Sequence, residues 1–302
     1  MTADLRALCD QAFAAAAQEA SEEVAAPALQ ALRMLQRAMC SVAPSCLRGA
    51  VTKVDTRLTL DDVIGLAEAK KALCNIVGFS APERQLAVRR FGLGPPGGAL
   101  LHGPPGNSKT RLVAAVASHF RLPVISLSAA DVYSAYVGDA EAEIRKAFCI
   151  ARQASPCVLF IDEIDAIVTN RQLGGGEGSG GAEARVLATF LVEMDGVSSA
   201  GGSSCIVIAA TNRLRAIDKA LLRKGRFHYL LHVPSPGPDD RLKLLQYFVG
   251  KYSGSGGGLD VDALRSRLRE GMSGAEVEGM VKEEALALLR KLVAEREGQG
   301  TG

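Results

Sequence analysis

Short apolar runs alternate with stretches of helical periodicity through the middle of the chain. The apolar runs cover residues 99–101, 123–127, 157–161, 205–210 and 229–233. The helical stretches between them cover residues 109–119, 140–153, 183–194 and 216–223. Runs that are apolar throughout are typical of strands buried on both faces, and their alternation with helices indicates a parallel sheet covered on both sides. The pattern therefore predicts an α/β fold built on a five-stranded parallel sheet with helices on both faces.

The hydrophobic pattern changes on either side of this core. After residue 233 the strand pattern stops, and helices are predicted over residues 238–250, 261–269 and 273–294. These helices predict a small all-helical unit that follows the sheet.

Before the core, a helix is predicted over residues 67–91, with an interruption around residues 80–82. Two short amphipathic helices, over residues 4–17 and 26–39, cannot bury both of their faces without a neighbour. Glycine- and serine-rich composition predicts flexible loops at residues 174–181, 196–204 and 253–258.

The amino-acid composition limits the kinds of molecule that the chain is expected to bind. The net charge is +2 over 302 residues, lysines and arginines never run longer than two, and tryptophan is absent. Neither a basic stripe nor a base-stacking surface is indicated, so direct nucleic-acid binding is not expected. No uncharged apolar run is long enough for a membrane span, and no secretory signal is visible. The seven scattered cysteines read as buried apolar side chains, which predicts a cytoplasmic protein, with a nuclear location also open.

A glycine- and proline-rich loop lies between the first apolar run and the first helix of the core. It reads Gly103, Pro104, Pro105, Gly106, Asn107, Ser108, Lys109 and Thr110, with Arg111 next. Strand, loop and helix in this order favour a phosphate-binding loop, whose backbone N–H groups wrap phosphates at the positive end of the helix. Lys109 would reach the β- and γ-phosphates and the Thr110 hydroxyl would bind Mg²⁺. Ser108 stands where the pattern expects glycine, and an ordinary turn before a helix is the alternative interpretation.

Two consecutive carboxylates, Asp162 and Glu163, follow a later apolar run. Side chains alternate along a strand, so two neighbours at its end can take different roles. Asp162 would hold Mg²⁺ opposite Thr110, and Glu163 would polarise an attacking water. A strand that simply ends in polar residues is the alternative, and the phosphate-binding loop upstream argues against it.

Asn212 and two arginines complete the set of candidate residues. Asn212 follows the apolar run 205–210 and would bind either the γ-phosphate or the attacking water; a cap on the next turn is the alternative. Arg223 and Arg226 flank a glycine near the edge of the predicted sheet. Their spacing suits arginine fingers, which stabilise charge during phosphoryl transfer, whereas a solvated basic turn is the plain interpretation.

Taken together, residues 103–110, 159–165 and 205–227 resemble the AAA ATPases. Residues 60–66 are similar to the segment whose backbone brackets adenine in that family, and residues 273–275 resemble the Ser-Gly-Ala start of its lid helix. The resemblance covers about residues 52–294 and implies binding of ATP with Mg²⁺, and ATP hydrolysis. It places Asp62, Gly65, Gly274 and Ala275 beside the nucleotide, and Phe248 where it could stack on the base.

The resemblance also implies an assembly. The segment Tyr136, Val137 and Gly138 corresponds to a central-pore loop that grips a polypeptide, and residues 174–181 to a second pore loop. Arg223 and Arg226 would reach the nucleotide of a neighbouring subunit, so catalysis would need a ring, typically a homo- or hetero-hexamer, working with adaptor proteins.

The N-terminal residues resemble the end of another AAA domain. Residues 1–51 are similar to a lid remnant and a linker between tandem domains, residues 52–233 to the large ATPase subdomain, and residues 234–302 to its helical lid. The chain is thus similar to the second domain of a tandem, valosin-containing-protein-type AAA protein. The closest branch resembles the spermatogenesis-associated AAA ATPases, which act in cytoplasmic maturation of large ribosomal subunits.

The expected activity is an ATP-driven motor that unfolds or remodels proteins. A nucleotide-binding regulatory or scaffold subunit with little activity alone is the second hypothesis, and a machine acting on nucleic acid is the third. The near-neutral charge weighs against the third.

Overall fold

The computed structural model describes residues 52–53, 58–80, 97–129, 132, 140–168, 180–199, 205–253 and 258–299. Several sequence predictions fall outside these residues. They are the two N-terminal helices, the linker before residue 52, the second part of the helix predicted over 67–91, the segment Tyr136 to Gly138, and nearly all of the loop 174–181.

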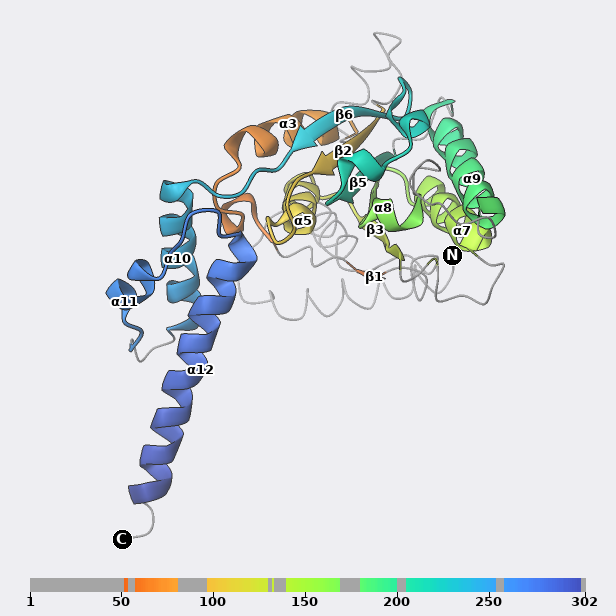
Figure 1. The fold of residues 1–302 in the computed structure, drawn as a ribbon. Helices are drawn as coiled ribbons and strands as arrows, with labels where there is room; N and C mark the ends of the chain where they lie inside the picture. The colour runs from red at the N-terminus through yellow and green to blue at the C-terminus, as the bar shows by residue number, and fades with distance from the viewer. Residues whose placement is uncertain are drawn as a thin grey trace, which may run out of the picture.

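The core of the fold is a six-stranded sheet in the order β1-β3-β4-β5-β2-β6 (Figure 1). Its five parallel strands are β2 (Gly98–His102), β3 (Val124–Leu127), β4 (Val158–Ile161), β5 (Ile206–Thr211) and β6 (Phe227–His232). The five-stranded parallel sheet predicted from the apolar runs is confirmed. The sixth strand, β1 (Thr52–Lys53), pairs antiparallel with β3 at one edge. At two residues it is too short to leave a hydrophobic pattern.

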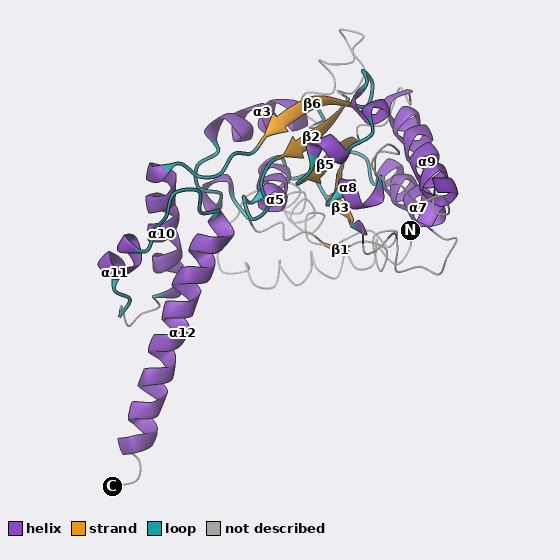
Figure 2. Cartoon of the chain, in the orientation of Figure 1, coloured by secondary structure: helices purple, strands orange, loops and turns teal. Residues whose placement is uncertain are grey.

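Helices cover both faces of the sheet (Figure 2), and a separate apolar core lies on each face. On one face α3 (Ala67–Gly78) and α5 (Lys109–His119) pack against alternate strand residues such as Leu101 and Phe160. On the other face α7 (Ala140–Gln153), α8 (Ile164–Ile167) and α9 (Gly180–Ser199) pack against the intervening residues, such as Leu100 and Leu159. Strands β2, β4 and β5 therefore bury both sets of their side chains, which is why these segments are unbroken apolar runs. Strands β3 and β6 alternate between more and less buried residues.

Two local predictions are wrong. The helix predicted over residues 216–223 is instead two 3-10 turns, η3 (Leu214–Ala216) and η4 (Lys219–Leu222). Asp218 interrupts the pattern because its side chain accepts a hydrogen bond from the backbone N–H of Ala220 at 2.8 Å and starts a new turn.

The loop predicted over residues 196–204 begins later than expected, because α9 continues through Gly196 to Ser199. Met194 and Val197 are buried in the core at the end of this helix. Their burial outweighs the cost of a helical glycine, which is about 1 kcal/mol.

The C-terminal helices are α10 (Pro238–Tyr252), α11 (Val261–Ser266) and α12 (Gly274–Gln299). They form a third apolar cluster that includes Leu245, Leu264 and Val281. In Figure 1 the N-terminal end of α12 lies near α5 and the helix runs away from the sheet. Within the described ranges, no helix combines the length and the apolar character needed to cross a membrane.

Candidate active site

The loop between β2 and α5 has a backbone that few side chains would allow. Gly106 has a φ of 76°, and a Cβ there would lie 3.0 Å from both the Ser273 Oγ and the Ala275 Cβ. A Cβ on Gly103 would collide with the carbonyl oxygen of Val233. Ser108 also has a positive φ, 60°, directly before α5 begins. A left-handed residue other than glycine costs about 1–2 kcal/mol, so Ser108 retains the shape that glycine usually provides here.

Lys109 is held across this loop. The residue is only 8 % exposed. The Nζ donates hydrogen bonds to the carbonyl oxygens of Gly103 at 2.9 Å and Pro104 at 2.8 Å, and to the Asn212 Oδ1 at 2.7 Å. Burial lowers the pKa of Lys109, and the carboxylates of Asp162 and Asp165 oppose that shift. A buried ammonium group is thus positioned between the loop and the end of β5, where an anionic ligand would compensate its desolvation.

Thr110 and Asp162 are brought together by the parallel packing of β2 and β4 around β5. The Thr110 Oγ1 donates to the Asp162 Oδ2 at 2.7 Å, and the backbone N–H of Glu163 donates to the other carboxylate oxygen at 3.0 Å. Hydroxyl and carboxylate oxygens are ligands that Mg²⁺ prefers. No cluster of three or more acidic, imidazole or thiol groups that could hold a metal occurs in the described parts of the chain. At a nucleotide, Mg²⁺ usually takes its remaining ligands from phosphate oxygens and water.

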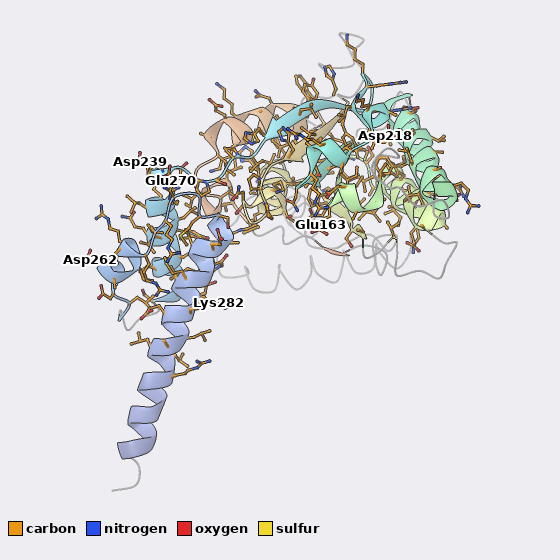
Figure 3. The ribbon with its side chains drawn as sticks, viewed as in Figure 1. Glu163, Asp218, Asp239, Asp262, Glu270 and Lys282 are labelled. Carbon is orange, nitrogen blue, oxygen red and sulfur yellow. The ribbon has the colours of Figure 1, made fainter. Side chains whose placement is uncertain are left out.

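Glu163 stands directly beside this pair. Its backbone is left-handed, with a φ of 51°, and its side chain is exposed at the start of α8 (Figure 3). The neighbouring strand end is fixed by a hydrogen bond from the Thr211 Oγ1 to the Asp165 Oδ1 at 2.8 Å. The backbone N–H of Arg213 donates to the same hydroxyl at 2.9 Å, which sets the turn that carries Asn212. A carboxylate that could accept a proton from water thus lies beside the two candidate metal ligands.

A cavity of about 360 Å³ opens beside the loop. Its walls come from the segment before α3, the loop itself, the residues after β6, and the C-terminal helices. The lining includes Ile64, Leu66, Asn107, Ser108, His232, Pro234, Ser235, Asp240, Leu244 and Gly274. The volume lies within the range of small-molecule sites, and an apolar wall with a few polar groups suits a nucleobase and its sugar.

The predicted nucleotide-binding residues do not all face this cavity. Asn107, Ser108 and Gly274 line it, and the backbone N–H of Ala275 donates to the Gly106 carbonyl oxygen at 3.0 Å. Gly65 has a φ of 70°, and a Cβ on it would lie 2.7 Å from the Asp240 Oδ2. The start of α12 therefore contacts the loop through a backbone hydrogen bond, and the segment before α3 lies against the Asp240 side chain of α10.

Asp62 and Arg111 connect elements instead of lining the cavity. The Asp62 carboxylate accepts from the Thr59 N–H at 2.8 Å and from the Tyr247 hydroxyl at 3.0 Å. Its hydrogen bonds with Thr59, and then the one from Tyr247, lower its pKa. An Arg111 Nη2 donates to the Asp62 carbonyl oxygen at 3.3 Å, while the Nη1 lies 4.0 Å from the Glu278 carboxylate. These contacts join the loop, the segment before α3 and the C-terminal helices.

Phe248 is not beside the cavity. It is 2 % exposed and packs inside the third cluster, with its ring 5.3 Å from that of Tyr247. Leu244, one helical turn closer to the loop, lines the cavity in its place. Phe248 therefore stabilises α10 against α12, and base stacking by this ring is not supported.

The two candidate arginine fingers differ in their surroundings. Arg223 is exposed at the end of η4, and its side chain has no hydrogen-bond or ion-pair partner among the described residues. Arg226 binds the Asp195 carboxylate with two hydrogen bonds of 2.8 Å, and its Nη1 donates to the Ala220 carbonyl oxygen at 2.8 Å. The hydrogen bond between the two side chains raises the pKa of Arg226 and lowers that of Asp195. Arg226 thus anchors the turn that carries Arg223 to α9.

Four supporting residues were missed at the sequence level: Asp165, Asp195, Tyr247 and Glu278. Asp165 follows the strand end by a few residues and could have been grouped with Asp162 and Glu163. The other three lie on helices, 26 to 185 residues from the partners they bind. No local pattern links residues at such separations.

The ends of β2, β4 and β5 thus bring a phosphate-type loop, a buried lysine and paired oxygen ligands to one edge of a parallel sheet, where α/β proteins bind nucleotides. The fold and this edge define a P-loop nucleoside triphosphatase. Residues 99–235 match the family described as ATPase family associated with various cellular activities (AAA). The chain therefore contains an AAA ATPase domain, whose reaction is ATP hydrolysis.

Similar full-length proteins agree with this assignment. The chain is 38% identical over 294 residues, 97% of its length, to the cell division control protein 48 homolog B of Arabidopsis thaliana. It is 38% identical over 238 residues to spastin of Danio rerio, and 33% identical over 303 residues to the cell division cycle protein 48 homolog of Archaeoglobus fulgidus. These alignments cover 78% and 96% of the chain. The chain spans 47%, 40% and 40% of the lengths of these relatives.

Proposed function

We propose that this chain is an AAA motor module that unfolds or remodels proteins or protein complexes by ATP hydrolysis within a hexameric ring. The observation that carries the proposal is the contrast between the two arginines. Arg226 is fully engaged within the chain, whereas Arg223 is exposed on the turn that Arg226 anchors. A turn that is fixed in place and exposes an unpaired guanidinium group is suited to place Arg223 as an arginine finger at the nucleotide of a neighbouring subunit.

The test is the ATPase rate per chain as a function of protein concentration, with wild type and Arg223→Ala. A shared site predicts that the wild-type rate rises steeply as subunits assemble. Arg223→Ala is expected to lower kcat by about a thousandfold, because an arginine finger is worth about 10³–10⁵ in rate, while ATP affinity stays unchanged. Lys224→Ala is the matched control, since Lys224 is an exposed cation on the same turn.

A wild-type rate per chain that stays near zero at every concentration would favour the regulatory or scaffold hypothesis instead. Ser108 at a position shaped for glycine is the observation on which that alternative rests. A wild-type rate that is substantial but independent of concentration would contradict a shared site.

The polypeptide substrate rests on the resemblance of Tyr136, Val137 and Gly138 to a pore loop, since these residues lie outside the described part of the chain. Tyr136→Ala is expected to retain ATP hydrolysis and to lose ATP-dependent unfolding of a fluorescent model protein. Tyr136→Phe should retain both activities, because the aromatic ring remains. Unfolding at the wild-type rate by Tyr136→Ala would exclude the grip assigned to this side chain.

The finer assignment extends the same resemblance. We propose that the chain corresponds to the second ATPase domain of a tandem AAA protein of the spermatogenesis-associated branch, with adaptor proteins and a role in cytoplasmic maturation of large ribosomal subunits. Sedimentation of a hydrolysis-deficient variant with precursors of the large ribosomal subunit in the presence of ATP tests this role. If the chain is absent from those fractions, the proposed role in ribosomal-subunit maturation is wrong.

A further inference from the structure

Asn107 carries a buried oxygen without a partner. The residue is 4 % exposed, and its Nδ2 donates to the Ser235 Oγ at 3.3 Å. Its Oδ1 is buried and accepts no hydrogen bond from any described residue. Buried side-chain oxygens in folded proteins nearly always have a partner, so an unsatisfied one calls for a specific explanation.

The position of Asn107 shows what kind of partner is missing. Asn107 and its partner Ser235 both line the cavity, and Asn107 precedes Lys109 by two residues on the loop. A triphosphate held by the loop would place its nucleoside in this cavity, against Ile64, Leu66 and Leu244. The residue that carries the unsatisfied oxygen therefore lies at the part of the site that would receive sugar and base.

A carboxamide oxygen can only accept a hydrogen bond. The ring nitrogens of adenine that remain in a nucleotide are acceptors, and only its exocyclic amine and the two ribose hydroxyls are donors. We infer that Asn107 is a specificity-determining residue whose Oδ1 accepts a hydrogen bond from a donor of the bound nucleoside, either a ribose hydroxyl or the exocyclic amine. The inference rests on the ATP binding of the proposed function.

Ser235 makes this oxygen selective. The hydrogen bond from Nδ2 to the Ser235 Oγ occupies the donor end of the carboxamide and leaves the acceptor end for the ligand. A nucleoside that lacks the donor would leave the Oδ1 buried and unsatisfied, which discriminates more strongly than loss of an exposed contact. Guanine, with a carbonyl in place of the amine, would bring a second acceptor to the site if the amine is the donor.

Isothermal titration calorimetry measures the affinity of the full chain and of its Asn107 variants for each of four ligands. The ligands are ATP, 2′-deoxy-ATP, 3′-deoxy-ATP and purine riboside triphosphate, which lacks the exocyclic amine. The wild type is expected to bind one of the three analogues about tenfold more weakly than ATP, and that analogue identifies the donor. Asn107→Leu should bind ATP about tenfold more weakly and show no further loss with that analogue.

Asn107→Asp is the matched control, because it keeps an acceptor oxygen in nearly the same volume. Its extra negative charge beside the phosphates weakens binding of all four ligands, and the preference against the one analogue remains. If Asn107→Leu does not fold, the affinities of the wild type and of Asn107→Asp for the analogues still test the inference. Equal affinity of the wild type for all four ligands, or the same analogue preference in Asn107→Leu as in the wild type, would overturn the inference.

Loss of the preference in Asn107→Asp would also overturn it, since the nucleoside would then be accepting from the Nδ2. A wild type that binds no ATP would overturn the proposed function and this inference together. If ATP binds but substitution of Asn107 does not change the preference among the analogues, only the inference about Asn107 is overturned.

Discussion

Replacement of Lys109 by alanine is expected to lower the affinity for ATP by at least about a hundredfold. The Nζ makes three hydrogen bonds, and its charge lies in a buried position where one charged hydrogen bond contributes about 1.5–3 kcal/mol. Because the ammonium group is partly desolvated before a ligand arrives, little additional desolvation opposes its contact with phosphate. Titration of the chain with a fluorescent ATP analogue measures the loss.

The truncation also removes the bridge between the loop and Asn212, so a change in folding must be separated from a change in binding. Lys109→Met is the matched control for packing, because it keeps a long unbranched stem and removes the charge. Both variants should lose affinity, while Lys109→Met should unfold nearer the wild-type temperature. ATP affinity unchanged in either folded variant would refute the phosphate-binding assignment of the loop.

Replacement of Glu163 by glutamine is expected to leave ATP binding intact and to reduce hydrolysis by about 10²–10⁴-fold. This is the usual contribution of a positioned acid–base group. The change preserves size, and the hydrogen bond to Asp162 comes from the backbone N–H of residue 163, which the substitution does not alter. The variant loses only the charge that draws a proton from water. Single-turnover hydrolysis, measured beside equilibrium ATP binding, separates the two effects.

Glu283→Gln is the control for this variant, because Glu283 is an exposed glutamate on α12. It should hydrolyse ATP at the wild-type rate. If Glu163→Gln hydrolyses ATP at the wild-type rate in a single turnover, Glu163 is not the residue that polarises the attacking water. Loss of ATP binding instead would show that the carboxylate holds the metal or the loop.

Much of the fold follows from local periodicity. Helix α5 begins and ends at residues 109 and 119 as predicted, and α7 matches the predicted 140–153. The five parallel strands follow from the unbroken apolar runs. The wrong boundaries, in η4 and at the end of α9, lie where a single hydrogen bond or a buried contact outweighs intrinsic propensity.

The candidate site was predicted where its residues follow strands. Thr110 and Asp162 are 52 residues apart, yet parallel strands bring their carboxyl ends to one edge, so the 2.7 Å contact is foreseeable. Phe248 shows the limit of this reasoning. Its position in the sequence predicted a contact with the nucleotide base. In the structure, the packing of α10 against α12 buries Phe248 in the third apolar cluster, and Leu244 lines the cavity instead.

The amino-acid sequence by itself determined the phosphate-type loop, the parallel sheet and the set of polar residues at its edge, because each depends on neighbours in the chain or on strand order. The tertiary structure alone decided which of these groups already have partners. Lys109 binds Asn212, and Arg226 binds Asp195. The Arg223 side chain has no partner among the described residues, and the Asn107 Oδ1 is unsatisfied there. These pairings depend on how separate helices and turns pack against one sheet, and no periodicity along the chain records that packing.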